Sequence, residues 1–246
     1  MKKLPKLFAL AALILIYSCS GGDETPSIVP MPNFNQDRLF IQPGETVTFT
    51  NTSTDGESYS WNFGDNSTLS TDENPTHTFN AVGNFNVTLS VTSSTGDVAT
   101  STSSVTVGNR WAVALAVTEV QFVNGNGDAW DPDGSGPEIL FGFFPVGQAE
   151  FDPFILGDDI TSDDLPIAGA IDESLQVAFT DTDWTFAFLD NDDPLTDPNT
   201  SDLMTSFNLN PVRIPTEEDY YQNGEGQFSF TANGYSIIIA FDIKAN

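Results

Sequence analysis

Apolar and polar side chains alternate along much of this chain, and the alternation predicts β-strands. Residues 85–91 read Phe-Asn-Val-Thr-Leu-Ser-Val, and 47–50 and 105–107 follow the same pattern. A period of two turns one face of a strand towards a core and the other towards solvent. Glycines punctuate these segments and no helical periodicity interrupts them. We therefore expect a small β-sandwich over residues 36–107, with Trp61 in its core.

Strand-like segments continue after residue 111, where acidic stretches separate them. Residues 113–122 alternate with one irregularity that predicts a bulge, and 237–241 are continuously apolar, as in a central strand. Several strands without a clear helix predict a second β-sandwich over 111–246, so the expected fold class is all-β with two sandwich domains. The expected strands of the second domain are 112–123, 139–144, 175–180, 184–189, 227–231 and 236–243.

The strong acidity of the chain removes several classes of function. Asp and Glu number 35 and Lys and Arg number 7, for a formal net charge of −28. Nucleic-acid phosphates need basic side chains, so nucleic acid is excluded as a partner. A single Cys and a single His argue against disulfides, Cys-based zinc sites and Ser-His-Asp chemistry. No catalytic motif is present either, so we expect a non-enzymatic protein without catalytic residues.

Residues 1–18 have the pattern of a secretory signal peptide. Three lysines precede an apolar run over 7–17, which is shorter than the about 20 residues that a membrane-spanning helix needs. The run ends in Ile-Tyr-Ser-Cys over 16–19, which resembles the lipoprotein box of bacteria. That resemblance implies that Cys19, the only cysteine, carries a lipid.

The residues after Cys19 extend this resemblance. Acidic side chains at 23 and 24 resemble the surface-export signal of Bacteroidetes-type lipoproteins, which implies a lipid-anchored protein exposed on the outer membrane. Residues 19–35 are then expected to form a flexible tether. The processed chain would keep all 35 acids and only four bases, for a net charge near −31.

A family resemblance is carried by residues 61–65, which read Trp-Asn-Phe-Gly-Asp. They resemble the Trp-x-Phe-Gly-Asp hallmark of PKD domains, and residues 74–91 are similar to the second half of that family in order and spacing. The resemblance implies an immunoglobulin-like sandwich over 36–107. For His77 we expect packing and hydrogen bonding, not catalysis, and for Asp65 we expect a cap on its own turn.

The acidic residues of the second domain are clustered, with no Lys or Arg in 124–137 or 190–202. Two carboxylates about 4 Å apart repel by about 4 kcal/mol at an effective dielectric constant near 20. Calcium takes six to eight oxygen ligands and would remove this repulsion if the clusters converge. The alternative is that the clusters are solvated loops that keep the protein soluble.

Two templates for a calcium site fit parts of these clusters. Residues 131–136 resemble the start of an EF-hand loop, but the flanks are strands and Gly142 stands where the loop needs a bidentate Glu. The second domain instead resembles the calcium-binding C-two sandwich first described in protein kinase C, over 134–141 and 184–204. That resemblance implies ligands from two loops. The candidate calcium ligands are Asp128, Asp131, Asp133, Asp190, Asp192, Asp197 and Asp202.

These patterns together predict a calcium-binding cell-surface lipoprotein that acts as an adhesion or interaction module. Its expected partners are the membrane, through the lipid anchor, and an extracellular protein. One alternative is a surface glycan-binding lipoprotein of a polysaccharide-uptake system, and another is a spacer in which calcium only stabilises the fold. Glycan binding needs exposed aromatic rings. The aromatic candidates are Trp111, Trp130, Trp184, Tyr220 and Tyr221.

Overall fold

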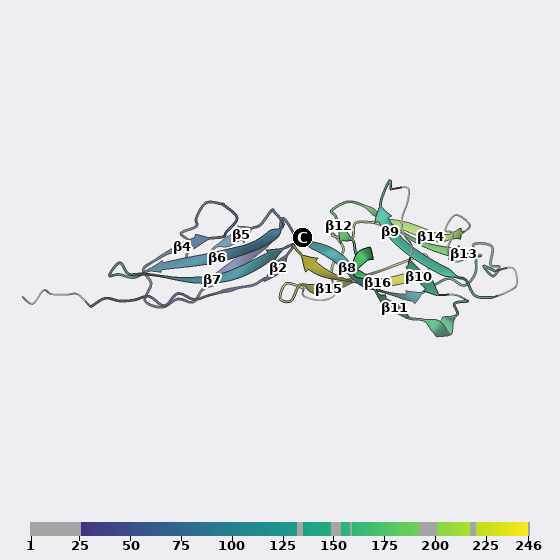
Figure 1. Ribbon diagram of the computed structural model, residues 1–246, viewed down its shortest axis with the longest axis horizontal. Helices are drawn as coiled ribbons and strands as arrows, with labels where there is room; N and C mark the ends of the chain where they lie inside the picture. Colours follow the sequence, from purple (N-terminus) through teal and green to yellow (C-terminus); the bar gives the residue numbers. More distant parts are fainter. Residues whose placement is uncertain are drawn as a thin grey trace, which may run out of the picture.

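Two β-domains lie in a row and give an elongated molecule, shown as a computed structural model in Figure 1. The structure describes residues 26–131, 135–148, 154–157, 159–191, 201–216 and 220–245, with the backbone alone at 201 and 202. The expected signal peptide and the expected lipidation site, Cys19, lie outside these residues. Apart from two 3-10 turns, every regular element described is a strand, which confirms the all-β expectation with two sandwich domains. Among the described residues, no helix has the length and apolarity to cross a membrane.

The first domain is a sandwich of two sheets, with strand orders β1-β3-β5 and β2-β7-β6-β4. The strands expected at 47–50, 85–91 and 105–107 lie within β3, β6 and β7. The first strand, β1, begins at Phe34, inside the stretch assigned to the tether. The strands are β1 (Phe34–Gln36), β2 (Phe40–Ile41), β3 (Thr46–Asn51), β4 (Ser58–Asn62), β5 (Thr76–Thr78), β6 (Gly83–Thr92) and β7 (Val98–Val107).

Aromatic rings fill the core of the first domain. Trp61 is fully buried, as predicted, and its ring packs on Phe34 and Phe49 with centroid distances of 5.0 and 5.7 Å. Its indole Nε1 donates a hydrogen bond to the backbone oxygen of Asp72 at 2.9 Å. A buried indole N–H usually has an acceptor, and this bond satisfies the Trp61 donor at the centre of the sandwich.

The second domain also contains two sheets, ordered β10-β9-β13-β14 and β11-β8-β16-β15, with β12 paired to β8. Their inner faces share one Phe-rich core that includes Phe141, Phe186, Phe188 and Phe228. The elements are β8 (Asn109–Glu119), β9 (Ile139–Pro145), β10 (Phe154–Gly157), η1 (Ser162–Asp164), β11 (Ile167–Ala170), η2 (Glu173–Leu175), β12 (Ala178–Phe179), β13 (Trp184–Asn191), β14 (Ser201–Leu209), β15 (Glu225–Ala232) and β16 (Tyr235–Lys244).

One expected strand of the second domain, 175–180, is wrong over half of its length. The structure has the 3-10 turn η2 up to Leu175 and only the two-residue strand β12 after it. The Asp172 side chain caps η2 by accepting a hydrogen bond from the backbone nitrogen of Ser174 at 2.9 Å. Local side-chain capping therefore outweighs the apolar pattern at the start of this segment.

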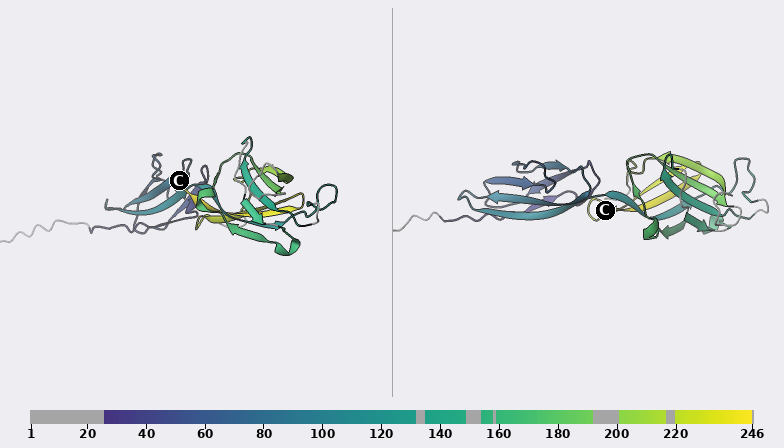
Figure 2. Two further views of the ribbon diagram at one scale, coloured as in Figure 1. Left: turned by 45° about the vertical axis from the view of Figure 1, so that its right-hand side comes forward. Right: turned by 45° about the horizontal axis from the view of Figure 1, so that its top comes forward.

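The chain crosses between the domains almost without leaving β-structure. Only Gly108 separates β7 from β8, and its nitrogen donates a hydrogen bond to the backbone oxygen of Ile41 at 2.9 Å. A Cβ atom at Gly108 would overlap the backbone carbonyl of Lys244, so the end of β16 packs directly on this crossing. Both turned views in Figure 2 show the two domains joined end to end at this point.

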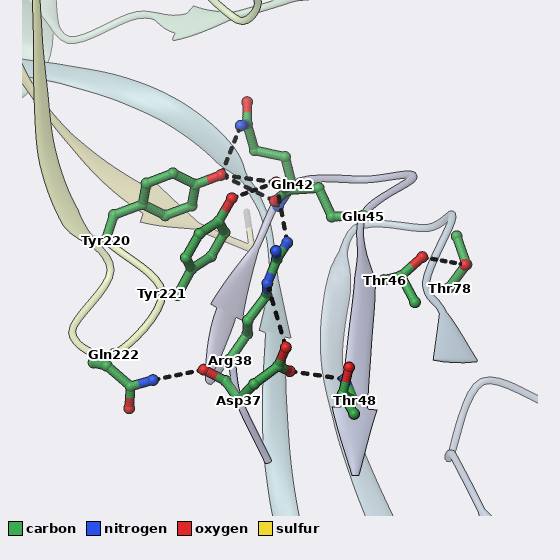
Figure 3. Close-up of polar contacts among 10 residues, drawn as sticks. All are labelled: Asp37, Arg38, Gln42, Glu45, Thr46, Thr48, Thr78, Tyr220, Tyr221 and Gln222. Atoms are coloured by element: carbon green, nitrogen blue, oxygen red, sulfur yellow. Dashed lines mark hydrogen bonds and ion pairs between the residues drawn. The ribbon is translucent and has the colours of Figure 1, made fainter. Parts of the chain in front are cut away.

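A polar cluster, which we call the joint, connects the 220–224 loop of the second domain to the first domain (Figure 3). The Tyr220 and Tyr221 hydroxyls each donate a hydrogen bond to the Glu45 carboxylate at 3.0 Å. The Arg38 guanidinium lies 4.0 Å from the centre of the Tyr221 ring and 3.6 Å from Glu45. The carboxylate is thus held by groups from both domains.

Backbone bonds and packing strengthen the joint. The backbone oxygen of Tyr221 accepts hydrogen bonds from the nitrogens of Leu39 at 2.6 Å and Phe40 at 3.0 Å. Gly224 adopts a positive φ of 82°, and a Cβ atom there would meet the Phe40 ring at 2.8 Å. The loop therefore fits closely against the first domain.

Candidate metal centre

Three carboxylates of the second domain converge at one end of the sandwich. Asp131 lies on the segment after β8, Glu138 directly precedes β9, and Asp190 lies near the end of β13. Each offers an oxygen, and these oxygens all lie within 4.8 Å of one another. We call Asp131, Glu138 and Asp190 the carboxylate triad.

Backbone pairing fixes two members of the triad. Asp190 pairs with Ile139 in the β13–β9 ladder, which brings the preceding residue, Glu138, beside it. The Glu138 nitrogen donates to the Asp190 Oδ1 atom at 3.1 Å, and the Asn191 nitrogen donates to the Glu138 backbone oxygen at 3.1 Å. The triad therefore rests on sheet geometry and not on loops alone.

Burial makes the negative charge of the triad costly. Only 1% of Asp190 and 8% of Asp131 is exposed, and Glu138 is partly buried. At separations of about 4–5 Å, unit charges repel by roughly 3–4 kcal/mol at an effective dielectric constant near 20. A buried charge is tolerated when an opposite charge accompanies it.

The basic side chains of the described chain make their contacts elsewhere. Arg110 donates to the backbone oxygens of Pro211 and Ile214, and Arg213 pairs with Asp181. Arg38 lies at the joint, and Lys244 lies at the opposite end of the second domain from the triad. The donor set within the described part of the chain is three hard oxygen ligands, which suits calcium or magnesium and not a soft metal.

The pKa of the Tyr235 hydroxyl is raised next to the triad. Burial raises the pKa of Tyr235 to about 12, and the negative charge of Asp190 contributes in the same direction. Tyr235 also packs on Phe188, with ring centroids 5.1 Å apart. Because Tyr235 begins β16 and Lys244 ends it beside Gly108, where the chain crosses between the domains, the triad lies at the end of the second domain that faces away from the first domain.

The structure brings together only part of the ligand set expected from the sequence. Asp131 and Asp190 belong to the triad, whereas Asp128 is exposed on a separate turn that closes through the bond from the Asn124 nitrogen to the Asp128 oxygen. The backbone of Asp202 pairs with Asp190 in the β13–β14 ladder. The other candidates, Asp133, Asp192 and Asp197, lie outside the described residues.

Glu138 is the member of the triad that the sequence analysis missed. It belongs to no Asp-x-Asp pattern, and in the EF-hand template it falls on a position that carries no carboxylate ligand. A sequence signal did exist, because Glu138 is the last polar residue before the apolar strand 139–144. A carboxylate at the end of a strand lies beside the residue that the paired strand places at the same end.

The aromatic candidates for glycan binding are distributed over the molecule. Trp184 is buried in the core, and Tyr220 and Tyr221 take part in the joint. Trp111 and Trp130 are partly exposed, and the indole of Trp130 donates to the Gln121 backbone oxygen at 3.0 Å. These five rings therefore do not form one binding platform.

Comparisons with known proteins bear mainly on the first domain. Residues 29–107 match the family model of the PKD domain. The PKD1 domain of Vibrio anguillarum Epp is 30% identical, with 33% of this chain and 96% of that chain covered and a TM-score of 0.29. The PKD1 domain from the Vibrio cholerae metalloprotease PrtV is 36% identical, with 32% and 98% covered and a TM-score of 0.28.

The comparisons say less about the second domain. A structure of carbohydrate-binding modules from the β-sandwich superfamily is 12% identical, with 89% of this chain and 94% of that chain covered. Its TM-score of 0.31 is too low to carry a functional conclusion. No curated protein sequence matches the chain. The family match agrees with the Trp61 motif, and residues 29–107 of the chain are a PKD domain.

Proposed function

We propose that this chain is a non-enzymatic, calcium-binding lipoprotein of the cell surface that acts as an adhesion or interaction module. The carboxylate triad of Asp131, Glu138 and Asp190 would hold the ion, with further oxygen ligands from the neighbouring segments. The observation that carries the proposal is the convergence of these three oxygens within 4.8 Å, two of them on buried side chains. The resemblance of the second domain to the C-two sandwich agrees with this assignment.

The arrangement of the domains supports a role in presenting the triad. The described chain begins beside the β6–β7 hairpin, where the Ser27 hydroxyl donates to Asp97 at 2.8 Å, and the triad lies at the end of the second domain that faces away from the first domain. A lipid on Cys19 would attach the molecule near this hairpin. The PKD domain would then act as a spacer that holds the second domain away from the outer membrane.

Calcium binding is tested by thermal unfolding and calorimetric titration of a soluble protein that starts at Pro26. A ligand at 100 times its dissociation constant stabilises the folded state by about 2.7 kcal/mol. For a chain of 150–250 residues, 1 kcal/mol corresponds to about 2–4 °C, so we expect the unfolding temperature to rise by about 5–11 °C in calcium and by less in magnesium. No calorimetric binding up to millimolar calcium would refute the proposal.

Two substitutions localise the site. Asp190→Asn keeps the Oδ1 acceptor for the Glu138 nitrogen but removes one charge. We expect this variant to be at least as stable as the parent in chelator, because repulsion within the triad is relieved, and to lose the calcium-induced rise in unfolding temperature. The control is Asp128→Asn, which lies outside the triad and should keep the full shift. If Asp128→Asn lost the calcium-induced shift and Asp190→Asn kept it, the calcium site would lie at the 124–128 turn instead.

A further inference from the structure

The edge strand β11 offers backbone groups to a partner. It is the last strand on one side of its sheet, and among the described residues only β8 pairs with it. The Ile171 nitrogen donates to the Val113 oxygen, and hydrogen-bonded pairs alternate in an antiparallel ladder. In the register Gly169↔Leu115 and Ala170↔Ala114, the N–H and C=O groups of Ala168 and Ala170 therefore point away from β8.

A hollow adjoins this edge on the outer face of the sheet. It measures about 420 Å³ and is lined mainly by small apolar side chains, including Ala114, Ala116, Ala168 and Ala240. These alanines lie on the face opposite the core residues Val117 and Ile239. Small side chains leave room there for larger apolar side chains of another chain.

A second gap opens on the other side of the same strand. It measures about 170 Å³ and lies between β10 and β11, with Phe154, Leu156 and Ile167 in its lining. A Cβ atom at Gly169, which borders both spaces, meets no atom within 4 Å. The two spaces therefore flank β11 on both faces of the sheet.

The charge around β11 selects the partner. Exposed carboxylates lie at both ends of the strand, Asp163 and Asp164 before it and Asp172 and Glu173 after it. The nearest described cation in the sequence, Arg213, is paired with Asp181. A second copy of this chain, with a net charge of −28, would be repelled. A segment that carries lysine or arginine on both flanks would be attracted.

We propose that β11 binds an extended peptide segment of another protein by strand addition. The segment has about four apolar residues flanked on both sides by Lys or Arg. Its backbone pairs with Ala168 and Ala170, and its alternate side chains enter the outer hollow and the inner gap. This docking surface is separate from the carboxylate triad, so the inference goes beyond the proposed calcium function.

The test titrates a labelled peptide, Lys-Lys-Val-Ile-Val-Ile-Lys-Lys, into the full processed chain and follows fluorescence anisotropy. We expect saturable binding that weakens as salt is raised, and little binding of the same peptide with Glu in place of Lys. Ala170→Pro removes an outward N–H but no ladder bond, since edge positions tolerate proline. This variant should bind the Lys-flanked peptide about fivefold more weakly.

Two further variants test the spaces on either side of β11. Ala116→Leu fills the outer hollow and Gly169→Val fills the inner gap, and we expect each to weaken binding at least fivefold. These two variants test the proposed peptide binding even if Ala170→Pro fails to fold. Thr231→Val, on the opposite edge strand β15, is the matched control and should bind as the parent does. Absence of binding at millimolar peptide, equal binding of the Glu-flanked peptide, or parental affinity in both space-filling variants would each overturn the proposal.

Discussion

His77 and Asp65 form the closest described ion pair of the PKD domain, and their contact is structural. The His77 Nε2 atom lies 2.7 Å from the Asp65 Oδ2 atom, and the imidazole stacks on Phe63 with ring centroids 3.9 Å apart. The other Asp65 oxygen accepts a bond from the Ser67 nitrogen at 3.1 Å, as a cap of its own turn. The pair thus ties the turn after β4 to β5, in agreement with the packing role expected for His77.

Replacing Asp65 tests this tie through its pH dependence. Burial alone would raise the pKa of Asp65, but hydrogen bonds from Ser67 and His77 outweigh it and lower the pKa below its usual range. A lowered carboxyl pKa adds stability above the unfolded value of about 3.9, and this stability is lost as the pH falls through the folded pKa. We expect Asp65→Asn to cost about 1–2 kcal/mol at pH 6 and progressively less below pH 4.

Chemical unfolding at several pH values measures this difference. Glu57→Gln is the control, because Glu57 is exposed in the same domain, and its stability should follow that of the parent at every pH. A constant difference between Asp65→Asn and the parent from pH 6 to pH 3 would show that the charge of Asp65 is irrelevant.

Among the strands, β6 shows how far alternation alone determines structure. Val87, Leu89 and Val91 are fully buried, and the residues between them are partly exposed, as the period of two predicts. β6 pairs with β4 on one side and β7 on the other, so it is central in its sheet. Its apolar face is therefore buried against the opposite sheet from Val87 to Val91.

Truncating a buried side chain of β6 should lower the stability strongly, whereas truncating the adjacent side chain on the outer face should not. Leu89→Ala leaves a cavity in the core, so we expect the PKD domain to lose about 2–5 kcal/mol of unfolding free energy. Ser90→Ala lies on the other face of the same strand and should change the stability by no more than about 0.5 kcal/mol. Urea unfolding followed by tryptophan fluorescence measures both, and equal losses in the two variants would contradict the assignment of faces.

Strands without this alternating pattern were not predicted from the sequence. β10 and β11 are four residues each, and β11 consists of Ile-Ala-Gly-Ala, whose small side chains give no clear alternation. β14 begins with Ser201 and Asp202, which were assigned to an acidic loop. These strands form because neighbouring strands offer backbone partners to them, and such a partner is invisible in a local pattern.

At the level of the whole molecule, the joint makes the two domains one mechanical unit. Burial raises the pKa of both Tyr220 and Tyr221, so their hydroxyls stay protonated as donors to Glu45. The ring of Tyr221 lies under Arg38, and its backbone oxygen binds Leu39 and Phe40. A spacer held at a fixed angle presents the far end of the molecule more uniformly than one on a flexible linker.

Removal of the Tyr221 ring should uncouple the domains. The variant Tyr221→Ala loses a hydrogen bond to a charged group and a cation–π contact, which together contribute about 2–4 kcal/mol. We expect the parent to unfold in one calorimetric transition and the variant in two, with a larger spread of shapes in small-angle X-ray scattering. Tyr221→Phe keeps the ring over Arg38, so its unfolding and its scattering should be intermediate between those of the parent and of Tyr221→Ala. An unchanged single transition and scattering curve for Tyr221→Ala would contradict a rigid joint.

The sequence by itself determined the features that depend on neighbours along the chain. Alternation predicted the long strands, and the Trp61 motif predicted the PKD domain, because both depend on the local periodicity of side chains. The spacing of the acidic residues predicted which segments carry candidate carboxylate ligands, but not which carboxylates lie close together. The expected calcium ligation and lipid anchor stay predictions.

Tertiary structure decided the features that join distant residues. Glu138 reaches Asp190 through the register of β9 and β13, and Tyr221 reaches Glu45 across 176 positions of sequence. The outer hollow beside β11 exists because alanines from three strands share one face of a sheet. Sheet register and domain docking depend on contacts far apart in the chain, so no local pattern specifies them.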